Sequence, residues 1–167
     1  YFMHGNRDFM IGESFADETG VMILEDPCVI ELHGENVLLS HGDYLCTDDV
    51  EYQQVRAMTR NPEWQAMMLA KSVEERSAFA RQAREQSQAR YGTVDEEIMD
   101  VNQDAVDAAI RDHGVDVLLH GHTHRPAVHP FHIDERPVHR IVLGDWYEQG
   151  SALEWDADGP RLEELPR

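Results

Sequence analysis

The chain has 167 residues, of which 41% are hydrophobic, and this length allows one domain with a substantial core. Its 14 basic and 33 acidic side chains give a formal charge of −19. This balance argues against a nucleic-acid partner, because such affinity comes mainly from Lys and Arg on phosphates. No apolar stretch approaches the ~20 residues that span a bilayer, so any membrane contact is expected to be peripheral. Cys28 and Cys46 lack CxxC spacing, which favours a reduced cytoplasmic protein.

Short β-branched runs, separated by Gly, Asp and Pro turn signals, predict the strands of a sheet. The runs cover residues 1–4, 21–24, 29–32, 37–40, 117–120, 138–143 and 152–155. The first run starts at Tyr1 without an initiator Met or a preceding turn. We therefore expect the natural protein to begin upstream of Tyr1.

A long segment from about residue 48 to 114 has a helical pattern. It separates the β-branched run at 37–40 from the run at 117–120. Its last helix shows a capping box, Thr93 with Glu96, and a stop signal at Gly114. Apolar side chains between these signals follow one helical face: Ile98, Val101, Ala105, Ala109 and Ile110. The predicted fold class is α/β, with helices inserted between strands.

The predicted insertion, about residues 50–92 of a single domain spanning 1–167, differs in charge from the rest of the chain. Residues 53–91 hold seven basic and four acidic side chains, next to the apolar run from Trp64 to Leu69. This combination favours a lid that contacts a ligand both anionic and apolar. The alternative is a solvated helical hairpin whose apolar stripe packs on the sheet.

Three histidines alternate in His120-Gly121-His122-Thr123-His124, directly after the apolar run at 117–119. Neutral imidazole is a ligand for divalent metals such as Mn and Zn, and a loop at a strand end can aim several ligands at one point. The motif therefore predicts a metal site. We expect His120 to point away from the metal and to support the ligands from behind.

Two further motifs also follow β-branched runs, Gly5-Asn6-Arg7-Asp8 and His41-Gly42-Asp43. Open α/β sheets place their sites at the carboxyl ends of strands. Each motif alone could be an ordinary turn. Three such motifs in one chain instead indicate one shared site.

These motifs, in this order, resemble the later sequence blocks of the calcineurin-like metallophosphoesterases. The longer strings HGNRDF, HGDYLCTDD, IMDVNQ and HGHTHRPAVH resemble the branch of that superfamily that acts on UDP-2,3-diacylglucosamine in lipid A biosynthesis. The resemblance covers the chain from Tyr1 to about residue 150. It implies a layered β-sandwich flanked by helices, with a helical lid and with its N-terminal strands missing from this chain.

The resemblance implies a centre of two Mn²⁺ ions. Asn6, His41 and His122 would bind one ion, and His124 the other. The family's Asp-x-His block and the Gly-Asp block that bridges the metals have no counterpart here. We therefore expect this chain alone to lack a complete dinuclear site and to be inactive.

The implied reaction is attack of metal-activated water on the pyrophosphate, which releases UMP and 2,3-diacylglucosamine 1-phosphate. Arg7 stays protonated, so it is expected to hold phosphate oxygens beside Asn6 and not to act as an acid. Its alternative role is pairing with a surface carboxylate. For the sugar and acyl chains, the family pattern points to Asp49, Tyr52, Arg84, Ser87 and His122. Tyr91 and Val94 stand where the family usually has polar lid residues.

The implied enzyme is peripheral on the cytoplasmic face of the inner membrane of a Gram-negative bacterium, and the sequence does not show whether it has protein partners. Two alternatives remain open. The protein could be another metallophosphoesterase, such as a general phosphodiesterase, which would not need a basic and apolar lid. It could also be a non-catalytic binding or structural module that binds at most one metal weakly.

Overall fold

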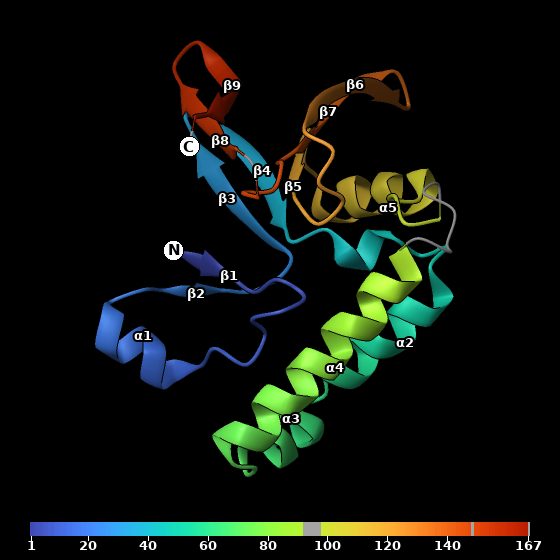
Figure 1. Cartoon of the computed structure of the whole chain (residues 1–167). Coiled ribbons are helices and arrows are strands. Elements are labelled where there is room, and N and C mark those ends of the chain that lie inside the picture. The colour runs from blue at the N-terminus through green and yellow to red at the C-terminus, as the bar shows by residue number, and fades with distance from the viewer. Residues whose placement is uncertain (92–97, 148, 167) are drawn as a thin grey trace.

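The computed structural model describes residues 1–91, 98–147 and 149–166. A five-stranded mixed sheet forms its centre, in the order β3-β4-β5-β7-β6 (Figure 1). β4 and β7 flank β5 in parallel, whereas β3 and β6 pair antiparallel at the edges. The strands are β3 (Cys28–Leu32), β4 (Glu35–Ser40), β5 (Val117–His120), β6 (Ala127–Ile133) and β7 (Arg136–Val142).

Alternating side chains of the central strands build a separate hydrophobic core on each face of the sheet. Leu38 and Leu118 are fully buried in a cluster with helix α5 (Gln103–His113). The neighbouring Val37 and Val117 belong to a second cluster, which includes Leu153 and Trp155 of strand β8 (Gly150–Asp156). β8 forms an antiparallel hairpin with β9 (Gly159–Leu165). The layers are therefore helix, sheet and hairpin.

The N-terminal segment forms a small unit beside the main sheet (Figure 1). Strand β1 (Phe2–Met3) pairs in parallel with β2 (Ile23–Leu24), and helix α1 (Glu13–Thr19) lies between them in sequence. α1 ends at Gly20, whose φ of 74° is the left-handed conformation that glycine adopts without strain.

The segment between β4 and β5 contains the short 3-10 turn η1 (Asp43–Leu45) and the helices α2 (Val50–Thr59), α3 (Pro62–Leu69) and α4 (Val73–Tyr91). α4 runs back alongside α2 toward the sheet (Figure 1). The α2 helix begins at Asp49, whose side chain accepts the Tyr52 amide. Within the described ranges, no helix is long and apolar enough to cross a membrane.

The structure confirms the α/β class, the helical insertion and each predicted strand within a few residues. It also contains α1, β6 and β9, which the sequence patterns did not predict. β6 carries His129, Pro130 and His132, residue types that conceal a strand signal, and it is an edge strand, where proline is tolerated. β9 contains Pro160 among charged residues, which conceals its pattern in the same way.

The helix predicted from Thr93 onward begins later than expected. Thr93 and Glu96 lie outside the described residues. Residues 98–102 form a turn and an extended stretch, so the helical prediction was wrong for Ile98 and Val101. α5 instead begins after Asn102, whose side chain accepts the Ala105 amide at 3.1 Å, and it ends at Gly114 as predicted.

Truncating a fully buried side chain of the central strand should destabilise the fold. We expect Leu118→Ala to lower the free energy of unfolding by about 3 kcal/mol, because it removes contacts of a residue with no exposed surface and leaves a cavity. Leu69→Ala, at a residue that is 50% exposed, is the matched control and should change stability by less than about 0.5 kcal/mol. Urea unfolding followed by circular dichroism measures both, and equal effects would contradict this placement of the core.

Candidate metal centre

The two central histidine turns start at the same level of the sheet. Parallel pairing of β4 with β5 sets Ser40 opposite His120, so the turns that follow both strands leave the sheet side by side. The Gly121 amide donates to the His41 carbonyl at 3.1 Å and joins the turns directly. As a result the rings of His41 and His122 lie 5.0 Å apart, centre to centre. The structure thus brings together two of the predicted ligands from segments about 80 residues apart in sequence.

Unusual backbone conformations shape both turns. Gly42 has a φ of 102°, and His122 and His124 have φ of 65° and 56°. A positive φ is uncommon for residues with a Cβ, and such strain concentrates at functional sites. The strained conformation of both histidines therefore agrees with a ligand role that fixes where their side chains point.

Burial keeps the two central histidines neutral. Loss of solvent, followed by the nearby His41, lowers the pKa of His122 to about 4. Burial also lowers the pKa of His41, although Asp43 and Asp26 oppose the shift. The Nε2 atom of His41 is buried and has no hydrogen-bond partner among the described residues. A neutral ring with an unused nitrogen is the form in which histidine binds a metal, so this pair fits a divalent ion.

The Asn6 turn reaches the same region from the N-terminal unit. Asn6 lines a cavity of about 230 Å³ together with His122 and His124. The turn is closed by Asp8, whose side chain accepts the Gly5 amide, and Arg60 of α2 donates to the Gly5 carbonyl at 3.1 Å. The N-terminal motif is therefore held by a hydrogen bond within its own turn and by a second one to the helical insertion.

Arg7 lies at the mouth of that cavity. Its side chain is exposed, and its Nη1 donates to the Tyr147 hydroxyl at 3.2 Å. In the part of the chain that the structure describes, Arg7 makes no ion pair with a carboxylate, and both roles predicted for it stay predictions. The guanidinium has five N–H donors in one plane, and this contact uses one of them, so the other four can bind an anion from the cavity side.

His124 lies apart from the central pair. Its side chain is 44% exposed, and its Nδ1 lies 3.5 Å from Asp145 Oδ2. Tyr147 packs beside it at 6.1 Å. Sequence reasoning missed Asp145, although Leu143-Gly144-Asp145 follows a strand as the three recognised motifs do. Within the described ranges, no group of three or more His, Cys, Asp or Glu side chains is close enough to hold a metal.

The predicted substrate residues of α2 lie at the wall of the cavity. The Tyr52 ring lies 5.2 Å from the His122 ring at a tilt of 39°, and the Tyr52 hydroxyl donates to Asp43 Oδ2 at 2.9 Å. Asp49 is 5% exposed and binds Arg90 through both oxygens, at 2.6 and 2.8 Å. Burial alone would raise the pKa of Asp49, but the Arg90 hydrogen bonds lower it. Asp49 is therefore an ionised partner of Arg90 in this conformation.

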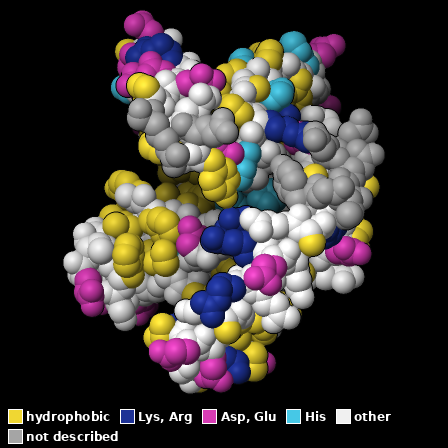
Figure 2. All heavy atoms as spheres, viewed as in Figure 1, with side chains coloured by type: hydrophobic (Ala, Val, Ile, Leu, Met, Phe, Trp, Pro, Cys, Tyr) yellow, Lys and Arg dark blue, Asp and Glu magenta, His cyan; other side chains and the backbone are white. Residues whose placement is uncertain are grey.

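The predicted substrate residues of α4 are both exposed, and they differ in position. Ser87 lines the cavity, as does Arg90. Arg84 is exposed on the same helix and is not among the residues that line this cavity. The side chain of Tyr91 and the whole of Val94 lie outside the described residues. In Figure 2, histidine side chains form the floor of a hollow with basic side chains beside it.

Asp43 ties the His41 turn to α2. The carboxylate is fully buried, 3.0 Å from Arg56 Nε and 3.8 Å from Arg60 Nη2, and it accepts the Tyr52 hydroxyl. The Gln53 side chain donates to the Asp43 carbonyl at 2.8 Å. Burial would raise the pKa of Asp43, but Arg56 and His41 outweigh it and lower the pKa. One carboxylate thus connects a metal-ligand turn to one face of the insertion.

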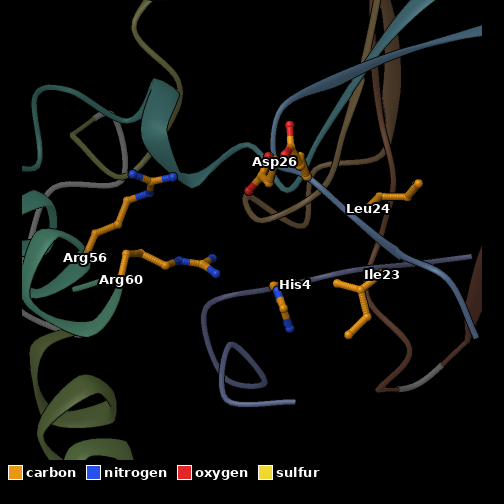
Figure 3. Close-up of a pocket in the computed structure, with 7 residues that line it drawn as sticks. His4, Ile23, Leu24, Asp26, Arg56 and Arg60 are labelled. Carbon is orange, nitrogen blue, oxygen red and sulfur yellow. The ribbon is translucent and has the colours of Figure 1, made fainter. Parts of the chain in front are cut away.

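A second cavity, of about 400 Å³, lies between the N-terminal unit and α2 (Figure 3). Arg56 and Arg60 reach toward it from one side, and His4 and Asp26 lie on the other. Asp26 Oδ1 accepts the Ser40 hydroxyl at 2.7 Å and the His41 amide at 3.0 Å. Asp26 therefore holds the His41 turn from the side of this second cavity.

Neutralising Asp43 should destabilise the fold in a pH-dependent way. We expect Asp43→Asn to cost about 1–3 kcal/mol at pH 7, because it leaves the buried ends of Arg56 and Tyr52 without an anionic partner. The folded pKa lies below the ordinary value of 3.8, so the contribution of Asp43 is present above that pH and is lost as the pH falls through the folded pKa. Urea unfolding measures the free energy of unfolding at pH 7 and at pH 3. The difference between wild type and variant should be smaller at pH 3.

Asp17→Asn, at an exposed carboxylate of α1, is the control for the change of net charge. It should leave stability within about 0.5 kcal/mol of wild type at pH 7. A loss as large as that of Asp43→Asn would mean that the general charge of the chain, and not the buried contacts of Asp43, determines the effect.

The signature of the calcineurin-like phosphoesterase family matches residues 1–126. The UDP-2,3-diacylglucosamine hydrolase of Stenotrophomonas maltophilia (strain R551-3) is 53% identical over 174 residues, which cover 100% of this chain and 70% of that protein. The hydrolase of the same name from Xanthomonas axonopodis pv. citri (strain 306) is 51% identical and is likewise covered over 70% of its length. That of Chromohalobacter salexigens is 51% identical, with 68% covered.

Proposed function

The chain belongs to the calcineurin-like phosphoesterase family, and we propose that the whole protein hydrolyses the pyrophosphate bond of UDP-2,3-diacylglucosamine in lipid A biosynthesis. The inactivity of this 167-residue chain by itself stays a prediction. The products would be UMP and 2,3-diacylglucosamine 1-phosphate. The observation that carries the proposal is the neutral, buried pair of His41 and His122, of which His122 lines a cavity together with Asn6 and Arg7. Relatives that share about half of the sequence and are named for this hydrolysis support it.

We propose that Asn6, His41 and His122 bind one divalent ion, and that His124 contributes to a second, with Mn²⁺ in both places. When bound, such ions neutralise charge on phosphoryl oxygens and lower the pKa of water. The described ligands fit the first ion better, because His41 and His122 already face each other. His124 contacts Asp145 instead, which makes Asp145 the nearest candidate to support it.

The chain's own residues would bind and orient the diphosphate. Arg7 lies exposed at the cavity mouth, held by the Tyr147 hydroxyl, and presents a planar set of N–H donors that matches phosphate oxygens. Tyr52 packs against His122 and its hydroxyl is hydrogen-bonded to Asp43, so its ring would form a fixed wall for the substrate. Burial, followed by the nearby Asp43, raises the pKa of Tyr52 far above its ordinary value, so its hydroxyl stays protonated.

The insertion would act as a lid over the sugar and the acyl chains. Tyr52, Arg84 and Ser87 would contact the sugar from α2 and α4, as the family pattern implies. For Asp49 the contact requires an exchange, because both of its oxygens are bound to Arg90 and one also accepts the Tyr52 amide. We propose that substrate hydroxyls compete with Arg90 for Asp49 when the lid closes.

Exposed apolar side chains on the insertion fit a substrate that carries acyl chains. Half-exposed apolar residues occur on all three helices, among them Met58, Met67, Leu69, Val73 and Phe79. Basic side chains lie on the same helices. We propose that this surface contacts the cytoplasmic face of the inner membrane peripherally, where apolar and basic groups act together.

The substrate proposal is tested by comparing a sugar pyrophosphate with a simple phosphodiester. We expect the intact gene product with Mn²⁺ to release UMP from UDP-2,3-diacylglucosamine, followed by chromatography, and to hydrolyse bis-p-nitrophenyl phosphate at least about 100-fold more slowly. The lid and Arg7 recognise parts of the first substrate that the second lacks, and binding remote groups lowers the barrier. Hydrolysis of only the nitrophenyl ester would identify a general phosphodiesterase instead.

The metal proposal is tested by titrating this 167-residue chain with Mn²⁺ and following free Mn²⁺ by electron paramagnetic resonance. We expect one equivalent to bind more tightly than any other. His122→Ala should weaken the binding of this equivalent by about 100-fold or more. Loss of a residue that only supports a ligand typically weakens metal binding by about 10–100-fold, and loss of a ligand should cost at least as much. His132→Ala, at an exposed histidine of β6, is the matched control and should bind as wild type. Two equally tight equivalents would contradict the assignment of His124.

A further inference from the structure

His120 occupies the space between the two metal-ligand turns and the body of the sheet. It is the last residue of β5 and is 1% exposed. It has the same parity along β5 as the buried Leu118, so its side chain points to the face of the sheet that α5 covers. The ring therefore lies beneath the turns, not in the cavity between them.

The His41 turn rests on the His120 ring. A Cβ atom added to Gly42 would lie 2.7 Å from His120 Nδ1 and 3.1 Å from its Cβ, closer than side chains approach. Gly42 also has a φ of 102°, a backbone conformation that residues with a Cβ atom rarely adopt. The glycine of this motif is thus required because an imidazole ring lies directly against the backbone.

Both nitrogens of His120 are engaged. Nδ1 lies 2.9 Å from the carbonyl of Gly121, which only accepts, so Nδ1 must carry the proton. Nε2 lies 3.2 Å from Nη1 of Arg140, which only donates, so Nε2 must be bare. The two contacts together define one tautomer and one ring orientation.

Arg140 reaches this position from β7, where it is paired with Leu118 in the sheet register. Its Nε is buried and has no hydrogen-bond partner among the described residues, and burial lowers its pKa. An arginine kept in such a place needs a reason, since a buried donor without a partner costs free energy. The contact with His120 and the charge of the nearby Asp100 supply that reason.

We propose that His120 is a positioning residue that sets the spacing between His41 and His122, and that Arg140 locks its tautomer and orientation. His120 holds the His41 turn through Gly42 and the His122 turn through the Gly121 carbonyl. A rotated or tilted ring would shift both turns at once. The effect of His120 on the spacing of the two histidines does not depend on the proposed function, whereas its consequence for hydrolysis rests on that function.

The first test needs no variant. Long-range ¹H–¹⁵N correlation spectra of the chain report the tautomer of each histidine. We expect His120 to carry its proton on Nδ1, with Nε2 giving the chemical shift of an unprotonated nitrogen that accepts a hydrogen bond. A spectrum with the proton on Nε2 would overturn the proposal, because Arg140 could not then donate to it.

The second test removes the lock. Arg140→Met keeps most of the side-chain length but no donor, and we expect Mn²⁺ to bind this chain about 10–100-fold more weakly. Arg136→Met is the matched control, because Arg136 lies on the same strand and pairs with Asp116 away from the site. It should bind Mn²⁺ as wild type. Arg140→Lys retains a donor and should recover part of the affinity.

Circular dichroism of each variant separates lost positioning from lost folding, and wild-type Mn²⁺ affinity in folded Arg140→Met would overturn the proposal. In the intact gene product, Arg140→Met should lower kcat about tenfold and leave KM nearly unchanged, since the substrate contacts are elsewhere. If the gene product does not hydrolyse UDP-2,3-diacylglucosamine but Arg140→Met still weakens Mn²⁺ binding, the proposed function fails and the role of His120 stands.

Discussion

The parallel register between β4 and β5 sets Ser40 opposite His120, and the contacts between the two histidine turns depend on that pairing. A shift of one residue would reverse which side chains face α5 and would separate Gly121 from the His41 carbonyl. The register is in turn fixed by the buried leucines on one face and the valines on the other. Packing of the apolar core therefore determines, through the sheet, where the ligand nitrogens lie.

Electrostatics within the insertion differ from what its charge suggested. The excess of basic residues at 53–91 predicted contacts with an anionic ligand. In the structure Arg56 and Arg60 lie against Asp43, and Arg90 lies against Asp49 and Glu51. Arg56 and Arg60 thus hold the insertion to the turn that follows β4, and Arg90 holds the end of α4 to the start of α2. Arg7, from the other side of the cavity, remains the residue best placed to meet a phosphate.

Much of this organisation could be predicted from the sequence because it depends on local signals. The β-branched runs predicted the strands of the sheet, and the polar motifs after them predicted which strand ends lie together. Gly114 predicted the end of α5. The contacts that complete the site are not local. Asp43 meets Arg56 only because α2 folds back on the turn, and Arg140 meets His120 only because β7 pairs beside β5. Neither pairing has a signature in the residues that surround it.

Edge strands and helix starts were harder to predict for related reasons. β6 is stabilised by pairing with β7, so its Pro and His residues need not follow a strand pattern. The start of α5 is determined by Asn102, one of several polar residues between Asp100 and Asp104 that could have capped the helix equally well by type. In both cases tertiary context chose among options that the sequence left open.

The insertion leaves the sheet after β4 and returns before β5, and these two strands are neighbours. Near the sheet, Asp49 at its start and Arg90 toward its end are fastened to each other. A segment closed at its base in this way can change in its distal part, around α3, while the contacts of α2 with Asp43 and the strands that carry the histidines stay as they are. Substitutions in the distal part of the insertion can therefore change which molecules bind, while the histidine turns stay the same. Substrate preference and reaction type are then encoded in separate stretches of one gene.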